Sequence, residues 1–200
     1  NVERILIDQL GKSKKNYSFI TEETGKIINK NNNVFWIIDP IDGTLNFLHG
    51  IPHFAISIAL QKDNEIISGL IFDPIKNEIF YAEKNNGSYL NNSRIRVSKK
   101  SNLEKCLFAS NNDGIKSVYP RLNLRNTGCA ALDLAYVGCG RLDGYFHNNI
   151  NLWDVAAGKI IIEEAGGKVN DIDGYKLNKI NIRAGNSNIY DKMIKLLCNF

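Results

Sequence analysis

Two carboxylates three residues apart, at the end of an apolar run, are the side chains of this sequence best suited to chemistry. Residues 36–47 read WIIDPIDGTLNF, in which Asp39 and Asp42 flank a Pro-Ile pair. The proline holds its neighbours extended, so both acids can converge where the chain turns. Two bare carboxylates this close would repel each other and take up protons, and a divalent cation between them removes the repulsion. Mg²⁺, which takes carboxylate oxygens, water and substrate phosphate as ligands, is the expected ion.

The residues after Asp42 suit an anion. Gly43 lets the backbone approach a ligand closely, and Thr44 is predicted to be the N-cap of a helix whose free amides bind anions. Cation ligands and an anion cradle would then lie side by side, which indicates a metal-dependent phosphatase. An isolated Asp-Gly is a common turn signal, and only the complete string favours a site over a turn.

Two further stretches carry acids. Residues 153–167, WDVAAGKIIIEEAGG, place Asp154 before a helical run that ends on two glycines. Alone, this Asp reads as a group that stabilises a helix N-terminus; beside the first string it is a candidate metal ligand. Residues 19–25, FITEETG, carry Glu22 and Glu23 after a strand, a pattern that by itself is typical of a solvated loop.

These residues depend on short strands and a few helices for their positions. We expect strands at residues 18–20, 34–38, 54–60, 66–72, 78–82 and 88–90, and helices at 2–10, 130–139 and 155–164. Asp63 and Asn64 should form a hairpin turn, Gly11 should end the first helix, and Pro40 should stop the strand before it. Tight turns between the early strands predict an antiparallel sheet.

Two lobes are expected. Residues 1–105 are predicted to form an N-terminal lobe with a mainly antiparallel sheet and the metal-binding motifs, and residues 106–200 a smaller C-terminal α/β lobe that supplies Asp154. Residues 1–10 read like the middle of a helix, so we expect N-terminal helices to be missing from this chain.

Composition excludes several classes of protein. The 200 residues are 44% hydrophobic, enough for a sizeable core, and no apolar stretch is long enough to span a bilayer. The net charge of +4 comes from scattered lysines, which is a poor argument for nucleic acid binding. The four cysteines are widely spaced without a CxxC pair, so we expect neither a zinc site nor a disulfide framework. A reducing, cytoplasmic location is expected instead.

Taken together, these strings resemble the inositol monophosphatase family. DPIDGT at 39–44 matches the family's first signature completely, and WDVAAGKIIIEEAGG matches the second. TEET at 21–24 departs at its first residue from the family's usual Gly-Glu-Glu, and RNTGCAALDLAYVGCGRLDGYF at 125–146 resembles bacterial SuhB-like members. The resemblance implies an α+β fold, the layered α-β-α-β-α sandwich of the sugar-phosphatase (inositol monophosphatase/fructose-1,6-bisphosphatase) type, and a homodimer.

By matching position, the resemblance also implies two or three Mg²⁺ ions. Glu22, Asp39 and the carbonyl of Ile41 would bind one ion. Asp39, Asp42 and Asp154 would bind a second, and Glu22 would support a third, looser ion through water.

The implied catalytic residues are Thr44 and Glu22. The Thr44 hydroxyl would orient and deprotonate the attacking water, and the acid paired with it in the family falls before Asn1. No covalent phosphoenzyme is expected. The implied substrate-binding residues are Asp42, Gly43, Thr44, Ala130, His147 and Asp154.

Departures from the family pattern leave the substrate open. His147 stands where inositol-specific members place a Glu that contacts a sugar hydroxyl; it could bond a hydroxyl or be an exposed loop residue. Cys129, expected beside Ala130 in the pocket, is interpreted as a packing residue, and His49 and His53 as structural. The chain is short between Ser110 and Arg125, where residues 113–114 should form a turn, and we expect a helix of the family to be missing there.

The expected function is a Mg²⁺-dependent phosphomonoesterase that hydrolyses inositol monophosphate or a related sugar phosphate by direct attack of a metal-activated water. Fructose 1,6-bisphosphate and 3′-phosphoadenosine 5′-phosphate are alternative substrates. A different alternative is a SuhB-like regulatory partner of RNA polymerase in ribosomal RNA transcription, which would need a basic surface. Lys99, Lys100 and Lys105 are candidates for such a surface or for an ordinary solvated face.

Overall fold

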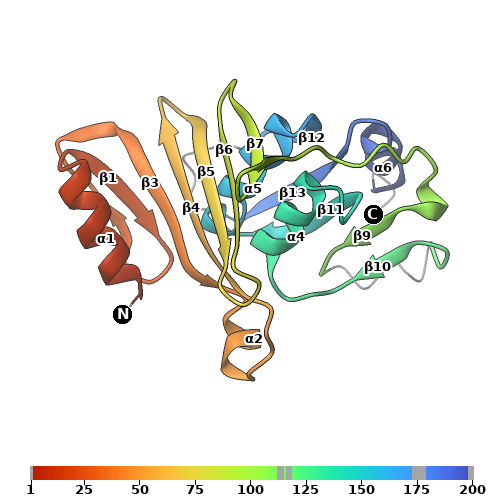
Figure 1. Cartoon of the computed structure of the whole chain (residues 1–200), viewed down its shortest axis with the longest axis horizontal. Helices are drawn as coiled ribbons and strands as arrows, with labels where there is room; N and C mark the ends of the chain where they lie inside the picture. Colours follow the sequence, from red (N-terminus) through yellow and green to blue (C-terminus); the bar gives the residue numbers. More distant parts are fainter. Residues whose placement is uncertain (1, 112–114, 116–118, 173–178, 198–200) are drawn as a thin grey trace.

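The chain folds into two β-sheets layered with helices (Figure 1). The computed structural model describes residues 2–111, 115, 119–172 and 179–197, with the backbone alone at 31 and 32. The expected turn at 113–114 lies outside the described residues. The larger sheet has the strand order β2-β1-β3-β4-β5-β6-β7-β8. Its strands are β1 (Tyr17–Thr21), β2 (Gly25–Ile27), β3 (Asn31–Asp42), β4 (Ala55–Lys62), β5 (Glu65–Asp73), β6 (Glu78–Glu83), β7 (Gly87–Leu90) and β8 (Ser93–Arg94).

The smaller sheet has the order β10-β9-β11-β13-β12. Its strands are β9 (Leu107–Ala109), β10 (Asn123–Arg125), β11 (Gly144–Ile150), β12 (Gly167–Val169) and β13 (Ile180–Asn186). The α-helices are α1 (Val2–Ser13), α2 (Thr44–Leu48), α4 (Ala130–Gly138), α5 (Leu152–Glu164) and α6 (Tyr190–Leu197).

Tight turns make the larger sheet antiparallel from β3 to β8, as expected, whereas β1 pairs with β3 in parallel. Asp63 and Asn64 join β4 to β5 with φ angles of 48° and 74°, the left-handed conformation that a two-residue hairpin needs. Gly11 does not end α1, which continues to Ser13, because a helix tolerates an interior glycine at a modest loss of stability.

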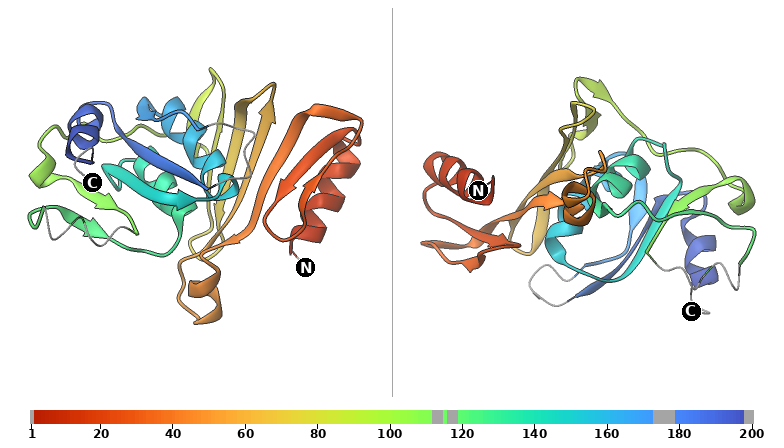
Figure 2. Two further views of the ribbon diagram at one scale, coloured as in Figure 1. Left: turned by 180° about the vertical axis from the view of Figure 1, so that it is seen from behind. Right: turned by 90° about the horizontal axis from the view of Figure 1, so that it is seen from below.

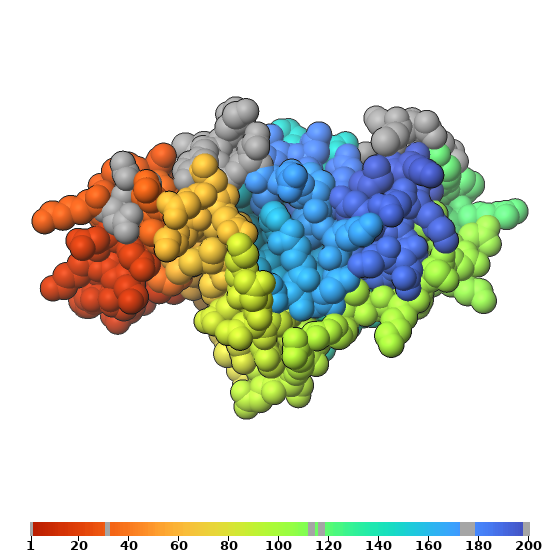
Figure 3. All heavy atoms as spheres, turned by 90° about the horizontal axis from the view of Figure 1, so that it is seen from above, coloured from red at the N-terminus to blue at the C-terminus, as the bar shows by residue number. Residues whose placement is uncertain are grey.

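Five layers follow one another in the order helix, sheet, helices, sheet, helix. α1 covers β1 and β3 on the outer face of the larger sheet, α4 and α5 lie between the sheets, and α6 packs on β13. Both views in Figure 2 keep this order from α1 to α6. Figure 3 shows the N-terminal elements at one end of the molecule and the C-terminal helix toward the other. The expected layered α/β sandwich is confirmed.

Cores lie on both faces of the smaller sheet, and side chains that alternate along β11 reach both of them. On β11, Tyr145 joins a core shared with α4 and α5, whereas Phe146 joins a second core that includes Met193 of α6. The two aromatic residues before His147 therefore pack against helices on opposite faces of the sheet.

α5 is the central helix of the fold and packs on both sheets. It contacts β4, β5 and β6 on one side and β12 and β13 on the other, so it is apolar around most of its circumference. Gly158 allows α4 to approach it, because a Cβ at this position would overlap the side chain of Leu134.

Gly158→Ala is expected to lower the free energy of unfolding by about 1–3 kcal/mol, the usual range for overpacking a core. The control is Gly11→Ala in α1, where the nearest atom to a new Cβ lies at an ordinary 3.9 Å. That variant should gain about 0.5–1 kcal/mol from helix propensity. Urea unfolding of both variants checks this, and equal changes at the two positions would contradict the close approach of α4 and α5.

The chain passes from the larger to the smaller sheet between Arg94 and Leu107. Helices from the second half also pack on the first sheet, since Ala131 and Ile160 share a core with Phe35 and Ile71. A division into lobes at residues 105 and 106 stays a prediction.

The thiols of Cys106, Cys129 and Cys139 are free, and Cys198 lies outside the described residues. Across the part of the chain that the structure describes, no helix combines the length and apolar character needed to cross a membrane.

Candidate active site

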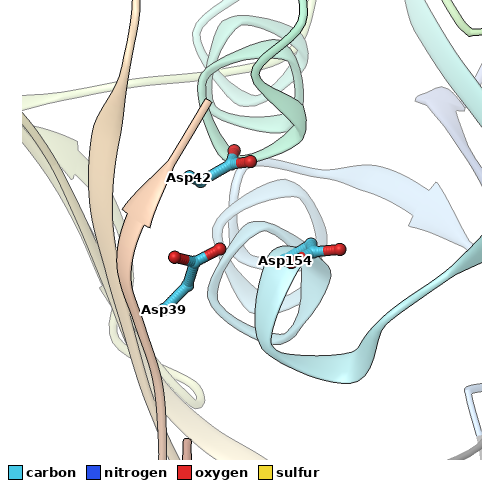
Figure 4. A group of neighbouring side chains, drawn as sticks. All are labelled: Asp39, Asp42 and Asp154. Atoms are coloured by element: carbon cyan, nitrogen blue, oxygen red, sulfur yellow. The ribbon is translucent and has the colours of Figure 1, made fainter. Parts of the chain in front are cut away.

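Three acidic side chains from two elements lie together where β3 ends and α5 begins (Figure 4). Asp39, Asp42 and Asp154 each offer a carboxylate oxygen within 4.8 Å of the others. Residues far apart in the sequence are thus brought to one point, as the two signature strings predict. Glu22 and Ile41 are not members of this group of three.

A β-bulge explains why the two acids of DPID are three residues apart. In a regular strand, residues i and i+3 point to opposite faces. Asp39 pairs with Ser57 and Asp42 with Ala55, so Pro40 and Ile41 together oppose a single residue of β4. The extra residue shifts the alternation by one and brings both carboxylates to the same face.

The expected end of the strand at Pro40 is therefore wrong. β3 continues to Asp42, because a proline, which cannot donate to a ladder, is tolerated at a bulge. The side chain of Asp39 supports this geometry, since its Oδ1 accepts a hydrogen bond from the Ile41 N–H at 2.9 Å.

Residues 73–76, DPIK, provide a contrast with DPID. Asp73 ends β5, precedes a proline, and accepts a hydrogen bond from Ile75 N–H at 2.9 Å, as Asp39 does from Ile41. Three residues on, however, stands Lys76, whose Nζ lies 2.8 Å from Asp73 Oδ2. Burial raises the pKa of Asp73, but the bonds and charge of Lys76 outweigh it and the pKa is lowered.

Among the residues that the structure describes, no lysine or arginine forms an ion pair with the group of three. Burial, followed by the charges of Asp42, Glu22 and Asp154, raises the pKa of Asp39 to about 10. Burial and Asp154 raise the pKa of Asp42 to about 7, and burial with the charge of Glu22 raises that of Asp154 to about 6. With Asp39 only 2% exposed, these carboxylates are held together at a free-energy cost. An oxygen-only donor set of this charge fits a hard divalent cation.

Two of the acids also fix helices. Asp42 Oδ2 accepts hydrogen bonds from Ala131 N–H at 2.5 Å and from the Cys129 thiol at 3.1 Å, so it caps α4. Asp154 Oδ2 accepts from the Asn151 N–H at 3.1 Å and completes a capping box at the start of α5. Asp154 can therefore cap α5 and also ligate a cation, since a carboxylate has several acceptor positions.

Glu22 lies at the exposed end of β1, beside the group of three. Its N–H donates to the Ile38 carbonyl at 3.3 Å, one residue before Asp39, and its charge raises the pKa of both Asp39 and Asp154. The parallel pairing of β1 and β3 therefore brings the TEET loop next to DPID.

The residues after Asp42 differ from expectation in one respect. Gly43, not Thr44, is the N-cap of α2, and Thr44 is its first helical residue. Gly43 has a φ of 85°, and a Cβ there would lie 3.0 Å from the His53 carbonyl, so the turn requires glycine. The Thr44 hydroxyl donates to the Ile41 carbonyl at 2.8 Å, which brings two of the implied functional groups together.

A cavity of about 150 Å³ adjoins the acids. Its lining includes four of the implied substrate-binding residues, namely Asp42, Ala130, His147 and Asp154. Asp133 and Tyr145 also line it, and neither is among the site residues predicted from the sequence. A lone acid inside the apolar run 130–139 was the available signal for Asp133.

Cys129 is buried, and its burial raises the pKa of the thiol well above the ordinary value, so it is a packing group rather than a nucleophile. His49 follows α2 on the surface, and His53 lies against Tyr136, so neither belongs to the group of acids. A larger cavity of about 330 Å³ lies elsewhere, and two of the four acids in its lining, Glu65 and Glu163, form ion pairs with Lys84 and Lys159.

Comparison with known proteins supports the resemblance. The family model for the inositol monophosphatase family matches residues 1–199. A protein of Haemophilus influenzae named Nus factor SuhB is 40% identical over 96% of this chain and 78% of its own length. A Thermotoga maritima protein named fructose-1,6-bisphosphatase/inositol-1-monophosphatase is 39% identical over 98% of this chain and 78% of its own length.

Solved structures of the same family have the same fold as this chain. The inositol monophosphatase from Anabaena superposes with a TM-score of 0.90 and 36% identity, over 98% of this chain and 84% of that one. Three findings lead to the same assignment: the family model matches almost the whole chain, the fold is shared, and the acids of both signatures lie together. The chain therefore belongs to the inositol monophosphatase family and is a phosphatase.

Proposed function

We propose that this phosphatase is a Mg²⁺-dependent phosphomonoesterase that hydrolyses inositol monophosphate or a related sugar phosphate. The observation that carries the proposal is the group of Asp39, Asp42 and Asp154, whose like charges are held together beside a cavity with no side-chain cation paired to them in the described part of the chain. Relatives named as phosphatases for inositol monophosphate or fructose 1,6-bisphosphate support this class of substrate.

The metal ligands follow from position. Asp39, Asp42 and Asp154 would hold one ion, and Glu22, Asp39 and the Ile41 carbonyl another, with Glu22 supporting a third ion through water. The Ile41 carbonyl can accept from Thr44 and still ligate, because it has two lone pairs. When bound, Mg²⁺ would acidify a water molecule and neutralise charge on the phosphate and leaving oxygen.

The remaining steps belong to the chain itself. The Gly43 and Thr44 amides at the start of α2 would hold the phosphate oxygens. The Thr44 hydroxyl, whose own hydrogen is directed at the Ile41 carbonyl, would accept a hydrogen bond from the attacking water and so orient it. Positioning and charge neutralisation supply most of the catalysis in phosphoryl transfer, so no covalent intermediate is needed.

Phosphate release with and without Mg²⁺ tests the proposal. The substrates are inositol 1-phosphate, fructose 1,6-bisphosphate, 3′-phosphoadenosine 5′-phosphate and glycerol 2-phosphate. We expect Mg²⁺-dependent turnover of at least one sugar phosphate. Mg²⁺ binding without turnover of any of them would contradict the substrate class and favour a regulatory role, as the name of the Haemophilus influenzae relative suggests for that protein. Absence of Mg²⁺ binding would contradict the metal assignment.

A basic surface for RNA polymerase receives little support from the lysines considered above. All three lysines are exposed, and Lys100 also forms an ion pair with the buried Asp143 carboxylate at 2.9 Å, a contact that stabilises the fold. The regulatory role stays a prediction, as does the cytoplasmic location.

His147 is proposed to select the substrate. Its Nδ1 lies 2.7 Å from the Tyr145 hydroxyl, and burial, with the charges of Lys179 and Arg183, lowers its pKa to about 4. The ring is therefore neutral at pH 7 and can bond a sugar hydroxyl without adding charge to the cavity.

His147→Glu is expected to raise kcat/KM for inositol 1-phosphate relative to fructose 1,6-bisphosphate by about 10-fold, the equivalent of one charge-assisted hydrogen bond to a hydroxyl. The control is Asn148→Asp, which adds the same charge one residue along and outside the cavity lining. Competition assays with both substrates check this. An equal change in the two variants would mean that charge alone, not a contact from position 147, is responsible.

A homodimer is also proposed, and α2 is the surface that supports it. α2 projects from the body of the molecule (Figure 1) and exposes Leu45 (70%), Phe47 (47%), Leu48 (73%) and, just beyond it, Ile51 (48%). Large apolar side chains gathered on one projection are typical of an interface.

Leu48→Glu is expected to convert the dimer to a monomer, because it would place a charge inside the apolar contact. Ile5→Glu is the control, since Ile5 is 54% exposed on α1, a different element. Light scattering coupled to size exclusion measures the mass of each variant. A Leu48→Glu protein that remains dimeric would place the interface elsewhere.

A further inference from the structure

A buried carboxylate on α1 holds the loop that carries Glu22. Glu3 is the buried residue of α1, 2% exposed. Its Oε1 accepts hydrogen bonds from the Thr21 hydroxyl at 3.0 Å and the Thr24 N–H at 2.9 Å. Its Oε2 accepts from the Glu23 N–H at 2.9 Å. One carboxylate thus binds the chain on both sides of Glu22.

These bonds restrain a loop that is otherwise exposed. Hydrogen bonds to an ionised carboxylate are about twice as strong as neutral ones. On the other side, the Glu22 N–H bonds the Ile38 carbonyl of β3. The backbone of Glu22 is therefore fixed between α1 and the strand that carries Asp39, although its own side chain is exposed.

Thr21 contributes a side-chain donor to this arrangement. It stands where the family pattern has glycine, which has no hydroxyl to donate. Its hydroxyl lies within reach of both Glu3 Oε1 and the Gly25 carbonyl, at 3.0 and 3.3 Å. Threonine in place of the glycine of Gly-Glu-Glu thus supplies one more hydrogen bond to the Glu3 carboxylate.

We propose that Glu3 is a positioning residue which, with Thr21, fixes Glu22 where its carboxylate can ligate a divalent cation together with Asp39. Glu3 itself touches neither substrate nor cation. The inference rests on the proposed function, in which Glu22 is a metal ligand. The expectation is that Glu3 sets the affinity for Mg²⁺ through the order of the loop.

Glu3→Gln tests this, because its amide group presents an N–H₂ to at least one of the donors. Calorimetric titration of the whole chain should give about 10-fold weaker Mg²⁺ binding, the usual effect of losing a group that orients a ligand. In the metal-free protein, hydrogen exchange at the Glu23 and Thr24 amides should quicken by about 10-fold. Asp8→Asn, on the exposed face of the same helix, is the matched control and should change neither measurement.

Glu22→Gln and the double variant separate this inference from the proposed function. If Glu3 acts through Glu22, the double variant should bind Mg²⁺ no more weakly than Glu22→Gln alone. Unchanged binding by Glu22→Gln would overturn the ligand assignment and the positioning role with it. Weaker binding by Glu22→Gln beside wild-type binding by Glu3→Gln would overturn the positioning role alone, and so would additive losses.

Thr21→Val keeps the test decisive should Glu3→Gln fail to fold. Valine has the shape of threonine and suits the end of a strand, but it lacks the hydroxyl donor. About 3-fold weaker Mg²⁺ binding is expected, the equivalent of one hydrogen bond. Wild-type affinity and wild-type exchange at the Glu23 and Thr24 amides would overturn the proposal.

Discussion

Asp39→Asn is expected to reduce phosphate release by at least about 10³-fold, equivalent to about 4 kcal/mol of transition-state stabilisation. Asp39 is the one acid proposed to ligate two ions, so its replacement removes a ligand from both. The substitution keeps the shape of the side chain, and an amide oxygen can still accept from the Ile41 N–H. The bulge should therefore persist while the negative charge is lost.

Asp73→Asn is the matched control for this experiment. Both acids precede a proline at a strand end and accept a bond from the residue two positions on, but Asp73 faces Lys76 rather than a second acid. We expect Asp73→Asn to keep activity within about 3-fold of wild type while lowering stability, because it removes a buried ion pair partner. Comparable losses of activity in both variants would show that the effect is structural and would contradict the role of Asp39 as a metal ligand.

The metal-free protein is expected to lose stability as the pH rises from about 5.5 to about 8.5, with a slope near 1.4 kcal/mol per pH unit for each proton involved. Asp39, Asp42 and Asp154 have folded-state pKa values of about 10, 7 and 6, all above their unfolded values. The folded protein therefore binds more protons than the unfolded chain in this range. Raised acid pKa values stabilise the fold at low pH, and this contribution is lost as the pH rises through them.

Urea unfolding in a chelator at the two pH values measures this slope. Added Mg²⁺ should restore stability at the higher pH, because the cation replaces the protons between the carboxylates. Asp39→Asn should flatten the slope. Asp73→Asn should leave it unchanged, because the pKa of Asp73 is lowered and its contribution is lost only at more acidic pH. If the free energy of unfolding in the chelator does not change between the two pH values, the pKa values of these three acids are not raised and the prediction is wrong.

The sequence by itself determined the family, the acids of the site and most of the elements that carry them. These features depend on local information. Periodicity predicted six strands of the larger sheet but neither β2 nor β8, and it predicted α5 from residue 155, whereas that helix begins at Leu152 and includes Asp154. Turn chemistry predicted the hairpin at Asp63 and Asn64, and the two signature strings contain the three acids that the fold brings together.

Only the tertiary structure decided how these acids meet and what holds them. The bulge at Pro40 depends on pairing with β4, and Gly43 rather than Thr44 is the N-cap of α2, with a φ of 85°. Glu3 lies on the helix face shared with Ile7 and Leu10, yet no local rule says that its carboxylate will meet a loop about twenty residues away. Burial and hydrogen bonding between distant segments are set by packing, so a carboxylate's role at this site follows from what packs around it rather than from its neighbours in sequence.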